Sequence, residues 1–177
     1  MRKITSIYIH HSASNFGNAK LIDLWHRERG FTEIGYHYVV CNGYLTAKDY
    51  KNGAIISDAI GYIDKGRNIK EIGSHVAGYN KESIGICLIH KDEPYIETQL
   101  ESYQLLVATL AQYFNVKIEN IKGHCEADKN KPLCPSLDMK KERKIISELM
   151  MNMSDVARDF YRIKYIEEGN EKLNKIN

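Results

Sequence analysis

The segment Ser83-Ile84-Gly85-Ile86-Cys87-Leu88-Ile89 decides the fold, because it is almost continuously apolar over the length of one strand. Such a strand is typical of a sheet that is buried on both faces. Upstream, residues 3–10 alternate in a β-rich run and predict a first strand. Downstream, a long helix is predicted from one apolar face, formed by Tyr103, Leu106, Val107, Leu110 and Phe114. We therefore expect an α/β protein, a single domain with a central mixed β-sheet flanked by helices.

Turn and cap residues divide the remaining sequence into elements. Asn18 is a predicted N-cap of a helix that Gly30 ends, with Trp25 in the core and His26 in solvent. Thr98 and Glu101 form a predicted capping box for the long helix. The other expected elements are a strand at residues 36–41, a turn at 42–43, its hairpin partner at 44–47, irregular Gly-rich loops at 51–80, a short connection at 121–125 and a helix at 138–150.

The composition changes near the C-terminus. We expect residues 1–150 to form the functional domain and residues 151–177 to form a charged tail that is helical. Val156, Phe160 and Ile163 are spaced to face the domain from such a helix, and a solvated tail is the alternative.

The overall composition excludes several classes of protein. The 177 residues carry 25 Lys and Arg against 23 Asp and Glu, a net charge of +2, which does not fit a nucleic-acid-binding protein. Four cysteines without a C-x-x-C pair do not make a disulfide framework, and Cys41 and Cys87 lie in expected strands. No apolar run has the length of a transmembrane segment, and the run at residues 4–9 is too short for a signal peptide. We expect synthesis in the cytoplasm and a monomer.

A histidine and a cysteine in loop-like sequence indicate a metal site. His124 and Cys134 are ten residues apart, and zinc accepts imidazole and thiolate together. His10 is placed to be the third ligand because it ends the first strand. His11 exchanges roles with His10 if the strand ends earlier, and Cys125 is a ligand only if the loop bends sharply.

Six ordered blocks, between about residues 3 and 140, resemble the zinc-dependent N-acetylmuramoyl-L-alanine amidases of the bacteriophage lysozyme-like and peptidoglycan recognition protein family. The blocks are Ile9-His10-His11-Ser12-Ala13-Ser14, Trp25-His26-Arg27-Glu28-Arg29-Gly30-Phe31, Ile34-Gly35-Tyr36-His37-Tyr38, Gly73-Ser74-His75-Val76-Ala77-Gly78-Tyr79-Asn80, Ser83-Ile84-Gly85-Ile86-Cys87-Leu88, and Gly123-His124 through Cys134-Pro135-Ser136. The resemblance implies an amidase and peptidoglycan-recognition-like fold.

The resemblance also implies a set of site residues. The zinc ligands fall on His10, His124 and Cys134, and the catalytic tyrosine falls on Tyr36. The family's catalytic lysine lies two residues before the ligand cysteine, where this sequence has Pro132. Lys131 is therefore the predicted lysine, and Lys129 is the alternative.

Two further residues of the matched blocks have open roles. His75 lies in the part of the sequence that matches the family's groove wall, so we expect it to bind substrate or to be structural. Glu126 is expected either to orient a metal ligand or to cap a turn.

The function implied is hydrolysis of the amide between N-acetylmuramic acid and the L-alanine of the stem peptide, with a zinc-activated water. The alternative is a peptidoglycan-binding or regulatory protein on the same fold, without catalysis. An enzyme without a signal peptide would reach the wall through phage or prophage lysis, or through a secretion machine that delivers it as a toxin.

Overall fold

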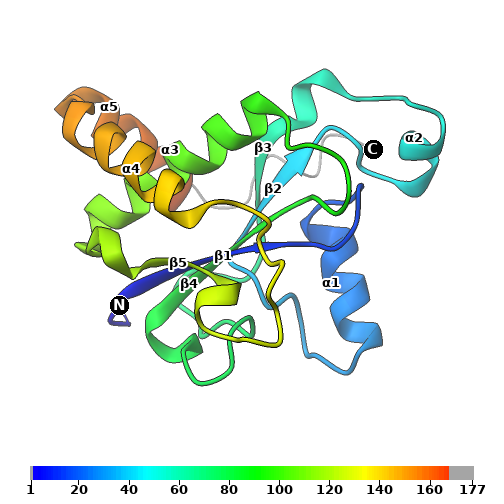
Figure 1. Cartoon of the computed structure of the whole chain (residues 1–177), viewed down its shortest axis with the longest axis horizontal. Helices are drawn as coiled ribbons and strands as arrows, with labels where there is room; N and C mark the ends of the chain where they lie inside the picture. The colour runs from blue at the N-terminus through cyan, green and yellow to red at the C-terminus, as the bar shows by residue number, and fades with distance from the viewer. Residues whose placement is uncertain (1, 168–177) are drawn as a thin grey trace.

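The computed structural model describes residues 2–167, and a five-stranded sheet forms its centre (Figure 1). The strand order is β3-β2-β4-β1-β5, and β3 alone is antiparallel to its neighbour, so the sheet is mixed as predicted. Every residue of β4 is buried, which confirms the central strand. The strands are β1 (Ser6–His11), β2 (Tyr38–Asn42), β3 (Ile60–Lys65), β4 (Ser83–Leu88) and β5 (Ile121–Gly123).

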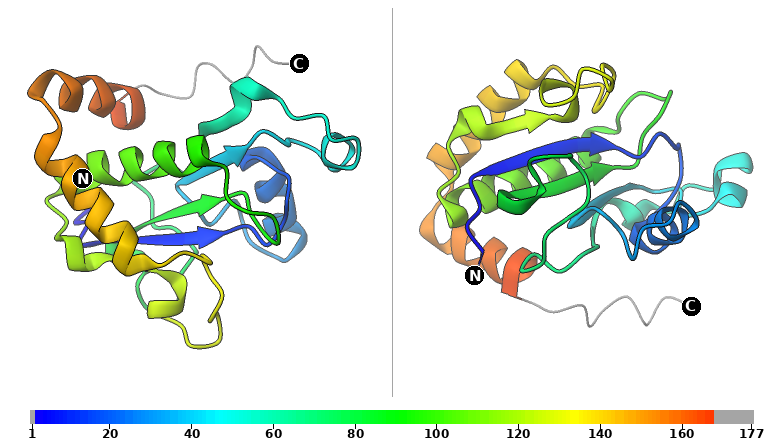
Figure 2. Two further views of the ribbon diagram at one scale, coloured as in Figure 1. Left: turned by 45° about the horizontal axis from the view of Figure 1, so that its top comes forward. Right: turned by 90° about the horizontal axis from the view of Figure 1, so that it is seen from below.

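Helices cover both faces of this sheet. α3, α4 and α5 lie together on one face, and α1 lies on the other (Figure 2). Asn18 accepts a hydrogen bond from the backbone N–H of Leu21 and Asp138 caps α4, so the predicted beginnings of these two helices are confirmed. The helices are α1 (Ala19–Glu28), α2 (Ala47–Lys51), α3 (Glu97–Phe114), α4 (Met139–Asn152) and α5 (Asp155–Arg162), followed by a π-helical turn (Ile163–Glu167).

The alternation of β1 separates the core from the site. Ile7 and Ile9 pack into the large apolar core beneath α3 and α4. Tyr8 and His10 point to the opposite face, where the ring of each contacts His75. Only part of this second face is covered by a smaller apolar cluster around α1. The side chains of His10 and His75 therefore lie on the same face of the sheet as α1, in a part of that face that loops cover instead of the helix.

Three expectations about the strands are wrong. The antiparallel partner of β2 is β3, whereas the expected partner at residues 44–47 leads into α2, whose N-cap is Thr46. The region 51–80, expected to be irregular, therefore contains a strand of the sheet. Residues 121–123 are the edge strand β5 rather than a connection. In each case long-range pairing with another strand decides the conformation, and the local sequence pattern does not show it.

The start of α3 and the face of α5 also differ from expectation. Ile96 precedes α3 and no side chain caps it, so the capping box of Thr98 and Glu101 is not formed. Gln99 instead fixes this end, because its buried amide donates to the backbone oxygens of β2 and of residue 89. The expected docking residues Val156, Phe160 and Ile163 are exposed, and the tail contacts the core through Ala157, Tyr161, Tyr165 and Ile166. The expected tail residues 168–177 lie outside the described residues.

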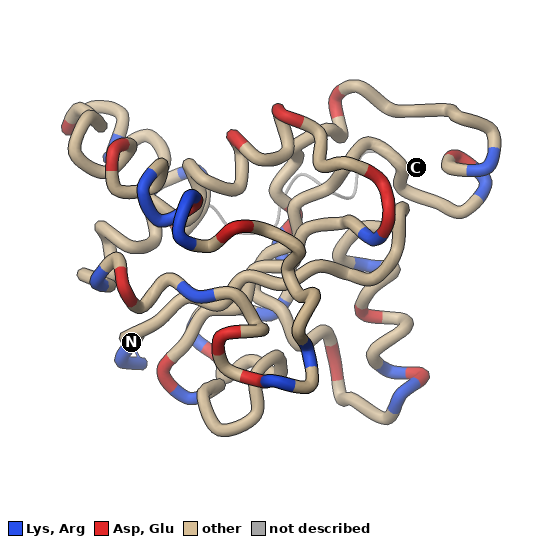
Figure 3. Tube along the Cα trace, in the orientation of Figure 1, with Lys and Arg blue, Asp and Glu red and all other residues tan. Residues whose placement is uncertain are grey.

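Acidic and basic residues are interspersed along the trace of the described residues (Figure 3). None of the described helices is long and apolar enough to cross a membrane.

Candidate metal centre and active site

Three side chains from separate parts of the chain meet at one point. His10 and His124 follow Ile9 and Gly123, which are paired residues of the parallel strands β1 and β5. Cys134 reaches the same point from the loop after β5. One ligand atom of each of the three lies within 4.8 Å of the others. The structure thus brings together the three ligands expected from the sequence.

The two alternative ligands occupy other places. The His11 ring lies against His90, and its Nδ1 accepts a hydrogen bond from the backbone of Ala13. Cys125 is not among the residues that group around the site, although its backbone N–H donates to the carbonyl of Cys134. The backbone N–H of His11 does contribute to the site, since it donates to Cys134 Sγ at 3.4 Å.

The donor set fits a zinc ion. The Nδ1 atoms of His10 and His124 are 3.1 Å apart. Two nitrogens bound to one tetrahedral zinc lie about 3.3 Å apart, so this spacing needs little adjustment. Two imidazoles and one thiolate leave one tetrahedral position for water or substrate, as in catalytic zinc sites.

The protonation preferences of these ligands follow from burial. Desolvation, followed by the neighbouring His75 and His124, lowers the pKa of His10 well below its ordinary value, so the ring is neutral. Burial raises the pKa of the Cys134 thiol to about 11, against a smaller opposite effect of the His11 N–H. A bound cation would convert this thiol to a thiolate near neutral pH.

Each histidine ligand has a different partner behind it. Nε2 of His10 lies 3.2 Å from Nδ1 of His75, a residue that is only 9% exposed. Nε2 of His124 lies 4.0 Å from the carboxylate of Asp128, which is half exposed. Burial lowers the pKa of His124, and the charge of Asp128 raises it. Metal-bound histidines commonly have such a partner on the second ring nitrogen.

Asp128 is a residue that the sequence reasoning missed. Its position four residues after His124 was the available signal. Glu126 was expected either to orient a metal ligand or to cap a turn. It accepts from the backbone N–H of Gly123 and pairs with Arg143, so it closes the turn after β5.

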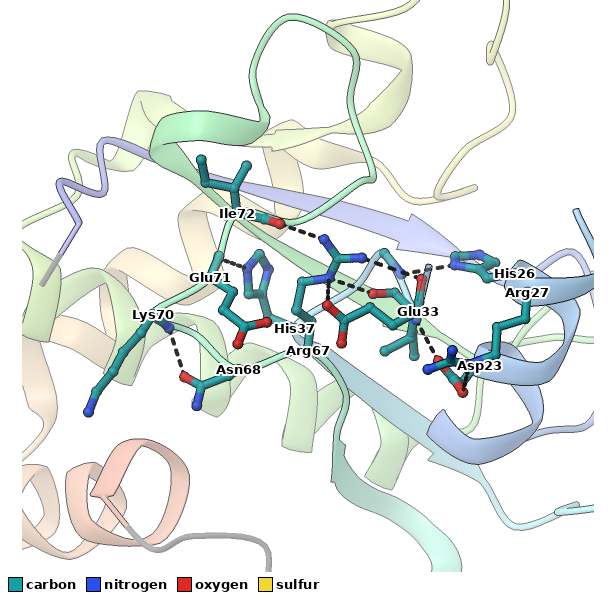
Figure 4. A network of polar contacts seen from close by, with 12 residues as sticks. Asp23, His26, Arg27, Glu33, His37, Arg67, Asn68, Lys70, Glu71 and Ile72 are labelled. Atoms are coloured by element: carbon teal, nitrogen blue, oxygen red, sulfur yellow. Dashed lines mark hydrogen bonds and ion pairs between the residues drawn. The ribbon is translucent and has the colours of Figure 1, made fainter. Parts of the chain in front are cut away.

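The backbone next to Tyr36 is held by side chains from both sides, among them Asp23, His26 and Arg67 (Figure 4). Asp23 accepts from the backbone N–H of Ile34, and His26 Nδ1 accepts from that of Gly35. Arg67 donates to the carbonyl of Ile34 through its side chain and to that of Tyr36 through its backbone N–H. The expectation that His26 faces solvent is wrong, because it is 6% exposed and required as this acceptor.

The Tyr36 side chain lies beside the metal ligands. Its ring centroid is 5.0 Å from that of His10. Burial, and next the nearby Cys87 and Cys134, raise the pKa of Tyr36 well above its ordinary value. The hydroxyl therefore keeps its proton near neutral pH and acts as a hydrogen-bond donor.

Lys131 acts on the site through its charge. Burial is the larger influence at both groups; the Lys131 charge adds to the lowering of the His124 pKa and opposes the raising of the Cys134 pKa. Its backbone N–H donates to Asp128, and its carbonyl accepts from Cys134, so a tight turn connects it to both site residues. Pro132 and Leu133 separate Lys131 from Cys134, and Leu133 is 75% exposed. The loop thus projects Leu133 outward, and the backbone of Lys131 is hydrogen-bonded to that of Cys134.

Comparisons with known proteins agree with this fold and site. Residues 1–136 match the model of the N-acetylmuramoyl-L-alanine amidase family. The endolysin of Escherichia phage T7 is 29% identical over 147 residues, which cover 77% of this chain and 83% of that protein. The endolysin of Klebsiella phage KP32 is 27% identical over 79% of this chain and 85% of its own length.

Solved structures show the same fold. The amidase LysC of Clostridium intestinale has a TM-score of 0.64 at 24% identity and covers 84% of this chain and 86% of its own. Drosophila PGRP-LB has a TM-score of 0.56 at 21% identity, with 84% and 81% covered. The chain belongs to the N-acetylmuramoyl-L-alanine amidase family. It is a peptidoglycan hydrolase that cleaves the amide between N-acetylmuramic acid and L-alanine.

Proposed function

We propose that the amidase reaction depends on zinc held by His10, His124 and Cys134. The observation that carries this proposal is the convergence of the three ligand atoms within 4.8 Å. A zinc ion bound there supplies a Lewis acid that polarises the scissile carbonyl and lowers the pKa of water. The family match supports a metal-dependent amidase, and the donor set favours zinc over harder cations.

Two side chains act on the substrate directly. The Tyr36 hydroxyl is protonated at neutral pH; it orients the attacking water and relays a proton, accepting one from the water as its own passes to the leaving nitrogen. The Lys131 ammonium stabilises the negative charge that develops on the carbonyl oxygen during attack. Lys131 takes this role over Lys129 because its charge acts on His124 and Cys134.

The test is the metal content and activity of purified protein. We expect about one zinc per chain, loss of muramoyl-peptide cleavage on chelation, and recovery when zinc is returned. Cys134→Ser should lose both the zinc and the activity. Cys125→Ser is the matched control, since the neighbouring thiol is outside the ligand group. Cleavage that survives chelation, or zinc that survives Cys134→Ser, contradicts the proposal.

The biological setting proposed is lysis. The enzyme is a monomer, made in the cytoplasm, that reaches the wall after release by lysis; the similarity to phage endolysins supports the lysis setting, and delivery by a secretion machine is the alternative. Residues 1–150 form the amidase domain and residues 151–177 the charged tail. The packing of α5 and the turn after it supports a stabilising role for the first part of this tail, where Tyr38 donates to the carbonyl of Tyr165.

A further inference from the structure

A row of hydrogen bonds connects a backbone carbonyl to the His10 ligand. The hydroxyl of Ser83 donates to the carbonyl of Tyr79 at 2.8 Å. Ser83 Oγ also lies 3.3 Å from Nε2 of His75, whose Nδ1 lies 3.2 Å from Nε2 of His10. Ser83 and His10 are fully buried. Water therefore has little access to this row, and its members must satisfy one another.

The carbonyl end determines the direction of the whole row. A carbonyl oxygen only accepts, so the single Ser83 proton points to Tyr79. Ser83 Oγ then accepts from Nε2–H of His75. A neutral His75 with its proton on Nε2 has a lone pair on Nδ1, which accepts from Nε2–H of His10. His10 is left with its lone pair on Nδ1, the atom that faces His124.

The opposite direction of donation along the row would place a proton on the His10 nitrogen that faces the metal position. If His75 donated from Nδ1, His10 would carry its proton on Nδ1 and would present N–H to the metal position. Neutral imidazole binds a metal only through its unprotonated nitrogen. The order of donors and acceptors in the row thus decides whether His10 is a ligand.

The sheet is shaped to receive His75. A Cβ atom added to Gly85 of β4 would lie 2.5 Å from His75 Cγ, and one added to Gly73 would lie 2.7 Å from His75 Cδ2. Glycine in the middle of a strand weakens it and often marks a close approach. Both glycines thus leave room for this ring against the central strand.

We infer that His75 is a positioning residue, which Ser83 and the Tyr79 carbonyl orient so that it fixes His10 as the Nε2–H tautomer and prepares Nδ1 for zinc. The inference rests on the proposed zinc function. In this inference His75 acts on the ligand His10 rather than on the substrate, and Ser83 fixes the hydrogen-bonding direction of His75.

The first test compares zinc affinities by competition with a chelator. His75→Leu removes the acceptor and should weaken zinc binding by about 10–100-fold, the usual effect of losing an outer partner of a metal ligand. His75→Asn should stay within about threefold of wild type, because its amide oxygen lies near the Nδ1 position and accepts the same bond. His90→Leu is the control, since His90 is equally buried but contacts His11 and Tyr95. Equal affinity of wild type and His75→Leu overturns the inference, as does an equal loss in His75→Asn and His75→Leu.

The second test reads the tautomer of His10 in metal-free protein by nitrogen-15 NMR near neutral pH. Wild type should carry the proton on Nε2, and Ser83→Ala should shift part of the population to Nδ1. Gly85→Ala should do the same without changing any member of the row, because it displaces the His75 ring. A proton on Nδ1 in wild type overturns the inference. A wild type that binds no zinc refutes the proposed function instead, and the tautomer still decides the inference.

Discussion

The two histidines proposed as zinc ligands lie in contrasting surroundings. His10 is on a central strand, has no exposed surface, and contacts the neutral, buried His75. His124 begins a short 3-10 helix that leads into a loop, keeps some exposure, and has the partly exposed carboxylate of Asp128 behind it. The sheet side is therefore fixed by packing and hydrogen bonds before any metal binds. The loop side contributes the charged groups Asp128 and Lys131, together with the Cys134 thiol that a bound cation would ionise, and all three belong to residues 124–136.

The largest expected effect is the loss of either ligand. His10→Ala and His124→Ala should both abolish zinc binding and activity, because a site with two ligands does not hold the ion. The variants should differ in the stability of the metal-free protein. His10→Ala removes a buried ring and leaves His75 without its donor, at about 1–3 kcal/mol of unfolding free energy. His124→Ala should cost less than about 1 kcal/mol.

Urea denaturation in the presence of a chelator measures this difference. Equal losses of stability in the two variants would contradict the contrast between a fixed sheet side and an adaptable loop side.

Tyr36→Phe tests whether a residue on the sheet side takes part in the reaction without contributing to zinc binding. We expect kcat to fall by about 10²–10⁴-fold, the usual contribution of a positioned proton donor, while zinc content stays at the wild-type level. Tyr62→Phe, an exposed tyrosine on β3, is the matched control and should leave kcat unchanged. A full kcat in Tyr36→Phe would remove this residue from the reaction.

On the loop side, the effects of Lys131→Ala and Lys129→Ala on kcat test which lysine takes part in the reaction. Loss of an oxyanion-stabilising group costs about 10²–10³-fold in kcat, and we expect Lys131→Ala to lie at the lower end because the side chain is exposed. Lys129→Ala, two residues away on the same loop, should change kcat by less than about threefold. The reverse order would assign the role to Lys129.

The sheet side could be predicted from the sequence better than the loop side. His10 lies near the end of an alternating strand and β4 is almost continuously apolar, so local pattern and tertiary position agree. The partner of β2 was missed because residues 60–65 pair at long range and contain Gly61 and Asp64, which have no strand preference. Asp128 was missed because its partner is a ring nitrogen, which only the folded loop brings within reach. His26 was placed in solvent because its acceptor role depends on a segment nine residues away.

Asp128→Asn should have a smaller effect than His75→Leu. The carboxylate lies 4.0 Å from His124 and is partly exposed, so water can replace it. We expect zinc affinity to fall by less than about tenfold, at the low end for an outer partner. Chelator competition on both variants gives the ranking, and a larger loss in Asp128→Asn would show that the charged partner is the more important one.

The expected effect furthest from the metal site is on the pH dependence of stability. Burial, and next the charge of Arg29, lower the pKa of His26 from its ordinary value of 6.5 to about 4. The unfolded chain therefore binds a proton between these values and the folded protein does not. The free energy of unfolding must fall as the pH decreases through this window. His26→Asn keeps an acceptor for Gly35 and removes the titration. Urea denaturation of chelator-treated protein at a series of pH values should show a shallower decline for this variant, and an identical slope would show that the His26 ring is not kept neutral by the fold.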